Sequence, residues 1–169
     1  MGNSSASNME YMDSIWPKLR KMNLNTVIAP VYWELMEPAE GKFDFKLVDY
    51  LISNARKNNF KLVLLWFGTW KNSMSCYVPA WVKKDYKTYP RAYDARGQAQ
   101  EILTPFSVSN LRADVDAFKA LMQYIRAHDE QQQTVIMIQV ENEIGMLPSA
   151  RDYHPDATKA FQQPVPAPY

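Results

Sequence analysis

Three short apolar runs recur along this chain of 169 residues, each long enough for a strand and too short for a membrane helix. They cover residues 26–31, 61–67 and 134–140, and segments with helical spacing lie before and between them. The first run is β-branched and continuously apolar, as expected for a strand covered on both faces in a parallel sheet, and the second is read in the same way. Pro30 predicts that the first strand ends near that residue. This pattern indicates an α/β fold.

Apolar stripes at helical spacing predict three helices. Ser7 and Glu10 have the spacing of a capping box at the start of the first helix, and Asp44 can cap the second. A long segment rich in Pro, Tyr and Trp, residues 68–110, interrupts the alternation of strand and helix patterns before the third helix. The predicted helices cover about residues 8–22, 44–55 and 111–125.

Alternating strands and helices predict βαβ units, which a doubly wound open sheet and a (β/α)8 TIM barrel both satisfy. No glycine-rich fingerprint follows either of the first two strands, where a dinucleotide or phosphate site would require one. Aromatic and acidic side chains follow the three strands instead, at the ends where barrel enzymes build their sites. The fold class that we predict is therefore the barrel.

The length of the chain limits how much of a barrel it can form. A barrel takes about 250 residues, and only three clear strands are present here. The first predicted helix has no strand before it, and the sequence stops in the Pro-rich run 164–169. We expect residues 1–169 to be one partial barrel domain, truncated at both ends and supplying roughly the first half of the barrel.

Charge and composition exclude several classes of protein. The formal net charge is +1, which is too balanced for a protein that grips nucleic acid. Cys76 is the single cysteine, and no His-x-x-x-His pair or acidic cluster offers a metal site, so we expect no disulfide, metal or cofactor. No membrane span is expected. The first residues, 1–7, show no export signal, which leaves the compartment open; a periplasmic or secreted full-length protein is compatible with the sequence.

Glu143 is the strongest candidate for catalysis because it follows the third predicted strand within a few residues, with Asn142 beside it. Glycoside cleavage needs a carboxylic acid that protonates the departing oxygen, and a partly desolvated carboxyl at the barrel rim can keep its proton near neutral pH. The alternative is that Glu141 and Glu143 are ordinary polar residues at a strand end.

Tryptophans after the strands are the second signal, because the apolar faces of sugar rings pack on aromatic side chains. Trp33 and Trp70 are candidates for this role, with Glu34 and Asn72 as polar partners for sugar hydroxyls. The alternative is that such tryptophans belong to the core, which we expect above all for Trp81. His128 and His154 are interpreted as surface residues.

Several segments in order resemble bacterial β-galactosidases of glycoside hydrolase families 35 and 42. They are Asn25-Thr26-Val27, then Trp33, the segment 37–45, Pro79-Ala80-Trp81 and the segment 139–145, which reads QVENEIG. The resemblance is to family 35 as a whole, with family 42 features in residues 89–97. Two positions depart from family 35: residues 70–76 replace its Cys-Ala-Glu-Trp stretch, and Glu34 stands where that family tends to have Asn.

The resemblance implies a retaining hydrolase on a (β/α)8 barrel. It implies that Glu143 is the general acid/base and that Asn142 holds the hydroxyl next to the reacting carbon. It also implies that the nucleophile is a second Glu after the seventh strand, outside this chain. We therefore predict an exo-acting β-galactosidase that needs no cofactor and whose isolated fragment is inactive. The alternatives are another β-glycosidase specificity of the same clan and a non-catalytic carbohydrate-binding barrel. The expected partners are a carbohydrate and either a second copy or the rest of the barrel.

Overall fold

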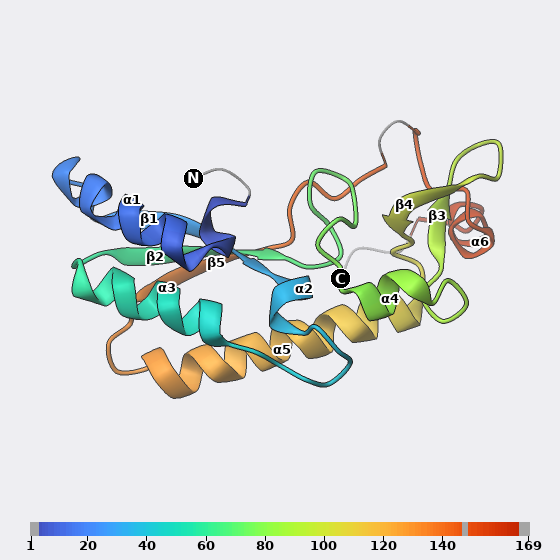
Figure 1. The fold of residues 1–169 in the computed structure, drawn as a ribbon. Helices are drawn as coiled ribbons and strands as arrows, with labels where there is room; N and C mark the ends of the chain where they lie inside the picture. Colours follow the sequence, from blue (N-terminus) through green and yellow to red (C-terminus); the bar gives the residue numbers. More distant parts are fainter. Residues whose placement is uncertain (1–3, 147–148, 166–169) are drawn as a thin grey trace.

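The computed structural model describes residues 4–146 and 149–165. Predictions for the first three residues and for 166–169 lie outside that range. The elements in chain order are η1 (Ser5–Ser7), α1 (Met9–Lys21), β1 (Thr26–Tyr32), α2 (Trp33–Met36), α3 (Lys46–Lys57), β2 (Lys61–Phe67), α4 (Ala80–Lys84), β3 (Arg91–Tyr93), β4 (Ala99–Leu103), α5 (Val108–Asp129), β5 (Val135–Val140) and α6 (Pro155–Phe161). Figure 1 shows their arrangement.

The central sheet is parallel, as predicted, and its strand order is β1-β2-β5. Thr26 pairs with Lys61 at one end of the β1–β2 ladder and Tyr32 with Phe67 at the other. The ladder from β2 to β5 ends at Trp66 and Val140. Because the strands run in the same direction and end together, the loops that follow them meet at one edge of the sheet (Figure 1).

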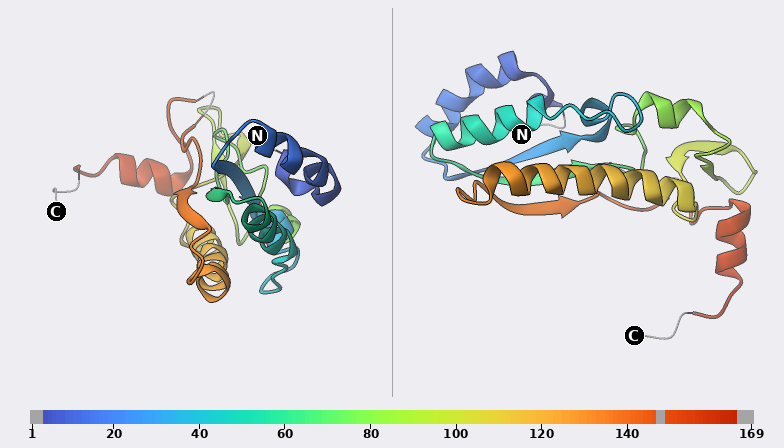
Figure 2. Two further views of the ribbon diagram at one scale, coloured as in Figure 1. Left: turned by 90° about the vertical axis from the view of Figure 1, so that its left-hand side faces the viewer. Right: turned by 90° about the horizontal axis from the view of Figure 1, so that it is seen from below.

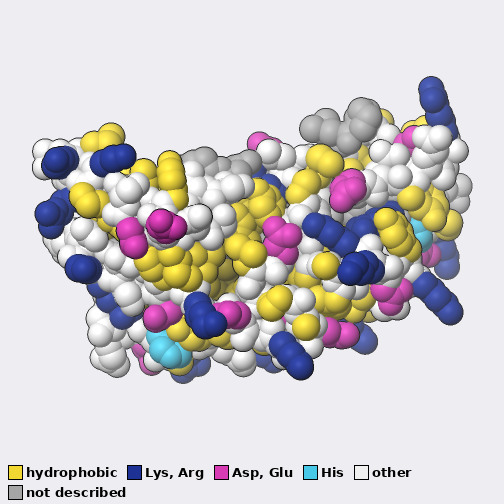
Figure 3. All heavy atoms as spheres, viewed as in Figure 1, with side chains coloured by type: hydrophobic (Ala, Val, Ile, Leu, Met, Phe, Trp, Pro, Cys, Tyr) yellow, Lys and Arg dark blue, Asp and Glu magenta, His cyan; other side chains and the backbone are white. Residues whose placement is uncertain are grey.

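The helices α1, α3 and α5 lie along one side of this sheet (Figure 2). Alternate strand residues point to that side and are buried with apolar residues of the helices. Buried members of this core are Val27, Ala29, Val31, Leu62, Leu64 and Trp66 from the strands, Met12 and Trp16 from α1, Leu51 and Ala55 from α3, and Leu121 from α5. In the space-filling view, apolar side chains also reach the surface between α1 and α3 (Figure 3).

The other side of the sheet is only partly covered within the described residues: Pro30 and Tyr32 of β1 are buried there, whereas Ile28 is not. This corrects the prediction that the first strand is buried on both faces along its length. Ile28 of β1 is 52% exposed and Met137 of β5 is 62% exposed. A continuous apolar run therefore identified the strands correctly. It did not reveal that part of the second face is exposed in the described residues.

Pro30 does not end the first strand, which continues to Tyr32. Proline lacks an N–H to give to a neighbouring strand, so it is tolerated where only one neighbour is paired. In the described sheet β1 is an edge strand that pairs with β2 alone.

Two helix starts differ from the prediction by a residue or two. Asn8, not Ser7, caps α1, because its side-chain oxygen accepts a hydrogen bond from the N–H of Tyr11 at 2.8 Å. Asp44 lies just before α3 and accepts from the N–H of Lys46 at 2.9 Å, while Phe45 occupies the cap position. No described helix is both long and apolar enough to cross a membrane.

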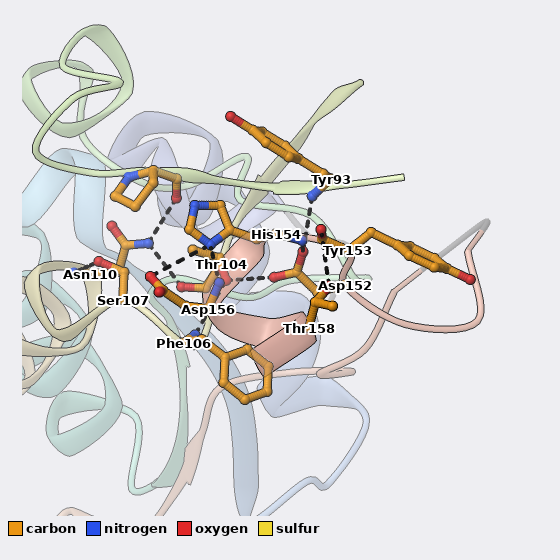
Figure 4. A network of polar contacts seen from close by, with 11 residues as sticks. Tyr93, Thr104, Phe106, Ser107, Asn110, Asp152, Tyr153, His154, Asp156 and Thr158 are labelled. Carbon is orange, nitrogen blue, oxygen red and sulfur yellow. Dashed lines mark hydrogen bonds and ion pairs between the residues drawn. The ribbon is translucent and has the colours of Figure 1, made fainter. Parts of the chain in front are cut away.

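The segment rich in Pro, Tyr and Trp, residues 68–110, contains α4 and an antiparallel hairpin of β3 and β4. The buried carboxylate of Asp152 joins this hairpin to the chain that follows β5 (Figure 4). One of its oxygens accepts from the N–H groups of Tyr93 and His154, and the other accepts from the hydroxyl of Thr104. Asp152 therefore anchors the chain after β5 to the hairpin of β3 and β4.

Candidate active site

Four of the predicted site residues come together where the loops after β2 and β5 meet. The N–H of Asn142 donates to the carbonyl of Trp70 at 3.2 Å. Ser73, next to Asn72, donates to the carbonyl of Glu143 from both its N–H, at 3.0 Å, and its hydroxyl, at 2.9 Å. Main-chain hydrogen bonds thus join the two loops, as the prediction of a single site at the strand ends requires.

Glu143 itself is exposed. It borders an open hollow of about 440 Å³ whose other lining residues are Ser73, Ile144, Gly145 and Met146. A carboxyl in such a place is accessible to a substrate. Asn142 is only partly exposed, and its side-chain Oδ1 is buried and has no hydrogen-bond partner among the described residues. An acceptor left unpaired in this way is suited to a hydroxyl donor from outside the chain.

Glu141, for which the sequence predicts no catalytic role, lies in a much less exposed environment than Glu143. Its two carboxyl oxygens accept from the N–H of Thr69 at 3.1 Å and the N–H of Trp70 at 2.6 Å. Asp114 of α5 faces it, and accepts from the indole N–H of Trp66 at 2.8 Å and from the same N–H of Thr69 at 2.8 Å. Burial, reinforced by the hydrogen bond and negative charge of Asp114, raises the pKa of Glu141 to about 10.

Gly68 makes this approach of two carboxyls geometrically feasible. A Cβ atom at position 68 would lie 2.6 Å from Oε1 of Glu141 and 2.7 Å from Oδ1 of Asp114. It would lie 2.3 Å from Nε1 of Trp66. Sequence reasoning missed Asp114 because it lies on a helix, 27 positions before Glu141; the available signal was Gly68, directly after the second strand.

Trp33 is placed in the core, and this corrects its assignment to the sugar site. It is 0% exposed, its indole N–H donates to Oε2 of Glu37 at 2.7 Å, and its ring packs against Trp66 and Trp81. A side chain covered in this way presents no face to a sugar in the described structure. Trp81 also packs on this core, which confirms its predicted structural role.

Glu34 also follows β1, but it lies with a different group of residues. Its N–H donates to the carbonyl of Tyr77 at 2.9 Å, and its carboxylate is 3.8 Å from the ammonium of Lys83. No described contact joins it to Glu143. Trp70 is buried in the structure at 5% exposure. Asn72 is exposed, and its side-chain oxygen accepts a hydrogen bond from the ammonium of Lys71.

Two other hollows lie away from Glu143. One, of about 590 Å³, is lined by Glu37, Trp81 and Tyr89 together with residues of α5, and none of the predicted site residues borders it. A smaller one, of about 270 Å³, is lined mainly by apolar residues and borders Trp70 as well as Glu141 and Asp114. Within residues 4–146 and 149–165, no group of His, Cys, Asp or Glu is arranged to hold a metal ion.

The parallel sheet, the helices on one side of it and the acidic residues after β5 are typical of one class, the glycoside hydrolases built on the TIM barrel. The model of the glycoside hydrolase family 42 β-galactosidases matches residues 5–169. The chain belongs to that family. The predicted resemblance to β-galactosidases is thus confirmed for family 42, and the comparisons give no support to the assignment to family 35.

A curated relative, the β-galactosidase LacA of Lactobacillus acidophilus, is 25% identical over 87 residues. The match covers 48% of this chain and 12% of LacA, so the chain corresponds to a small part of that enzyme.

Solved structures show the same fold at low identity. A catalytic mutant of Gan42B, a family 42 β-galactosidase from G. stearothermophilus, matches with a TM-score of 0.69 and 17% identity over 95% of this chain and 22% of its own. The β-galactosidase of the psychrophilic Marinomonas ef1 gives 0.67 and 16%, over 88% of this chain and 22% of its own. The catalytic domain of a β-amylase from Paenibacillus polymyxa scores 0.68 at 16% identity, over 91% of this chain and 42% of its own. The fold is therefore shared by enzymes with different names, and it does not settle the substrate.

Proposed function

We propose that this chain is part of the catalytic barrel of a retaining, exo-acting β-galactosidase in which Glu143 is the general acid/base. The observation that carries the proposal is the junction of the loops after β2 and β5, where an exposed carboxyl and an unpaired amide oxygen lie on neighbouring residues. Membership of family 42 supports the substrate class. The partial barrel spanning residues 1–169 and the galactose specificity are parts of the same proposal.

In the proposed reaction, a carboxylate nucleophile elsewhere in the barrel attacks the anomeric carbon while Glu143 protonates the departing oxygen. Glu143, now ionised, then removes a proton from the water that hydrolyses the glycosyl-enzyme. Asn142 accepts a hydrogen bond from the sugar hydroxyl next to the reacting carbon. Trp70 and Asn72, in the loop after β2 that is hydrogen-bonded to this segment, are further candidates for sugar contacts, and Glu34 is a more distant one.

The test is the variant Glu143→Ala in a protein with the complete barrel. Cleavage of a galactoside with a poor leaving group should fall by about 10²–10⁴-fold, because that oxygen needs protonation. An aryl galactoside with a good leaving group should lose less in the first step, and added azide should restore turnover by replacing activated water. Glu10→Ala, a substitution of an exposed glutamate on α1, is the matched control and should leave both rates unchanged.

The outcomes separate the alternatives. Equal loss on both substrates without azide rescue would exclude Glu143 as the acid/base. A complete protein that binds galactose and cleaves no aryl glycoside would instead be a carbohydrate-binding barrel. Cleavage of another aryl β-glycoside in preference to the galactoside would keep the mechanism and change the sugar.

A further inference from the structure

The meeting of Asp114 and Glu141 is unusual because two acidic side chains approach each other without a cationic partner. Within the described residues, neither carboxyl forms an ion pair with a Lys, Arg or His side chain. Lys71 lies in the loop after β2, but its ammonium binds Oδ1 of Asn72 and lies over the ring of Phe67 at 5.2 Å. The donors that reach the pair are neutral: one indole N–H and two main-chain N–H groups.

We propose that Asp114 and Glu141 hold one proton between them and act as a positioning pair, which fixes Asn142 and Glu143 against the loop after β2. Two ionised carboxylates this close repel each other, whereas one proton turns the contact into a hydrogen bond. The N–H of Thr69 bridges the two side chains, since it donates to an oxygen of each. The pair therefore connects three elements: α5, the loop after β2 and the end of β5.

The chain after β5 requires such a support because its backbone is strained. Glu141 has φ of 63° and Glu143 has φ of 53°, so two of three consecutive residues are in the left-handed region without being glycine. The side chain of Glu141 is held by Thr69 and Trp70, and the N–H of Asn142 and the carbonyl of Glu143 are held by Trp70 and Ser73. Among these contacts, those of Glu141 are the ones made by a titratable side chain of this segment.

The geometry assigns Glu141 to positioning and not to the reaction itself. Its two oxygens are taken by main-chain N–H groups, and Asp114 covers it from α5. Glu143, two residues on, has an exposed side chain. The inference rests on the proposed function only in naming Glu143 as the group that is positioned.

Infrared difference spectroscopy of the purified protein at pH 7 tests the shared proton. The spectrum of the unchanged protein minus that of Glu141→Gln should contain the absorption band of one protonated carboxyl group. The variant Asp114→Asn should lack this band as well. Glu143→Gln is the matched control and should retain it. Persistence of the band in both Glu141→Gln and Asp114→Asn would overturn the proposal. If both variants fail to fold, ¹³C NMR of the carboxyl groups in the unchanged protein tests whether the pair holds a proton. One carboxyl of the pair should stay protonated at pH 7, and two ionised carboxyls would overturn the pair.

Turnover in a protein with the complete barrel tests the positioning role. Glu141→Ala should lower kcat by about 10²-fold with a smaller change in KM, because a displaced catalytic group costs rate more than binding. Glu141→Gln should recover most of that loss, since its amide keeps an acceptor and can donate to Asp114. Azide should rescue Glu143→Ala and not Glu141→Ala. Azide rescue of Glu141→Ala would make Glu141 catalytic and overturn the positioning role. Loss of azide rescue in Glu143→Ala with the shared band intact would instead refute the proposed function and leave the proton pair standing.

Discussion

Arg56 of α3 and Asp129 at the end of α5 form an ion pair with 2.6 Å between Nη2 and Oδ1, and it joins these two helices on the covered side of the sheet. The same guanidinium donates to the hydroxyl of Thr134, and the second oxygen of Asp129 accepts from the N–H of Val135 at 2.7 Å. The carboxylate of Asp129 is 2% exposed. This one side chain therefore sets the turn between α5 and the start of β5.

Replacing Asp129 by Ala should lower the free energy of unfolding by about 2–4 kcal/mol, because it removes the charged partner of Arg56 and leaves the N–H of Val135 without its acceptor. Urea unfolding of the purified protein measures the change. Glu130→Ala is the matched control: its side chain is exposed, and its 3.8 Å contact with Arg126 is a surface pair worth under about 0.5 kcal/mol. A similar loss in both variants would show that the ion pair is not responsible.

Asp129 should also contribute to the loss of stability in acid. Burial alone would raise its pKa, but the hydrogen bonds from Arg56, Val135 and Thr134 outweigh burial and hold the pKa below its usual value. A lowered pKa means that the stabilisation is present above the ordinary pKa of Asp and is lost as the pH falls through the lower pKa of the folded state. The free energy of unfolding of Asp129→Asn should therefore depend less on pH below about pH 4. The same dependence of the free energy of unfolding on pH in acid, in both proteins, would contradict this.

The sequence was sufficient for the parallel sheet because the apolar runs at 61–67 and 134–140 coincide with β2 and β5 within one residue. The sequence predicted two local features less well, the end of β1 and the hairpin of β3 and β4. Pro30 was interpreted without knowing that β1 is an edge strand, and the hairpin of β3 and β4 consists of strands of only three and five residues. Such short strands carry too few residues for a periodic pattern.

The candidate site could be predicted only in part. Positions directly after strands identified Trp70, Asn142 and Glu143, because parallel strands bring their ends to one edge. Trp33 follows a strand in the same way, yet the short helix α2 begins at that residue and it is buried. The pairing of Asp114 with Glu141 depends on how α5 packs on the sheet, and no local pattern contains that information.

Gly68→Ala should destabilise the protein by about 1–3 kcal/mol, because the added methyl group overlaps Trp66, Asp114 and Glu141 where they meet. The contact at 2.3 Å is with an indole nitrogen that is fixed by its own hydrogen bond, so the neighbours cannot move at low cost. Gly145→Ala is the control, since the nearest atom to its added carbon is Oγ of Ser73 at 3.9 Å. Thermal unfolding of both variants should separate them, and equal values would show that the space at Gly68 can adapt.

The raised pKa of Glu141 should make stability fall as the pH rises. In the unfolded chain this group loses its proton near the ordinary pKa of Glu, whereas in the folded protein it keeps the proton until about pH 10. The folded state thus binds more protons over that interval, and its stability decreases by at most about 1.4 kcal/mol per pH unit. Glu141→Gln cannot ionise, so urea unfolding between pH 5 and 9 should show a smaller decrease. An identical decrease in both proteins would place the titrating group elsewhere.

Trp33→Phe should reduce the free energy of unfolding by about 2–4 kcal/mol, because the smaller ring leaves a cavity in the core and Glu37 loses its indole donor. Burial already raises the pKa of Glu37, and the hydrogen bond from Trp33 opposes that rise, so the variant should raise the pKa of Glu37 further. Urea unfolding and an NMR titration of the Glu37 carboxyl measure the two effects. Trp33 would instead be a sugar-binding residue if the variant kept its stability and the pKa of Glu37 while galactose binding to the complete protein weakened.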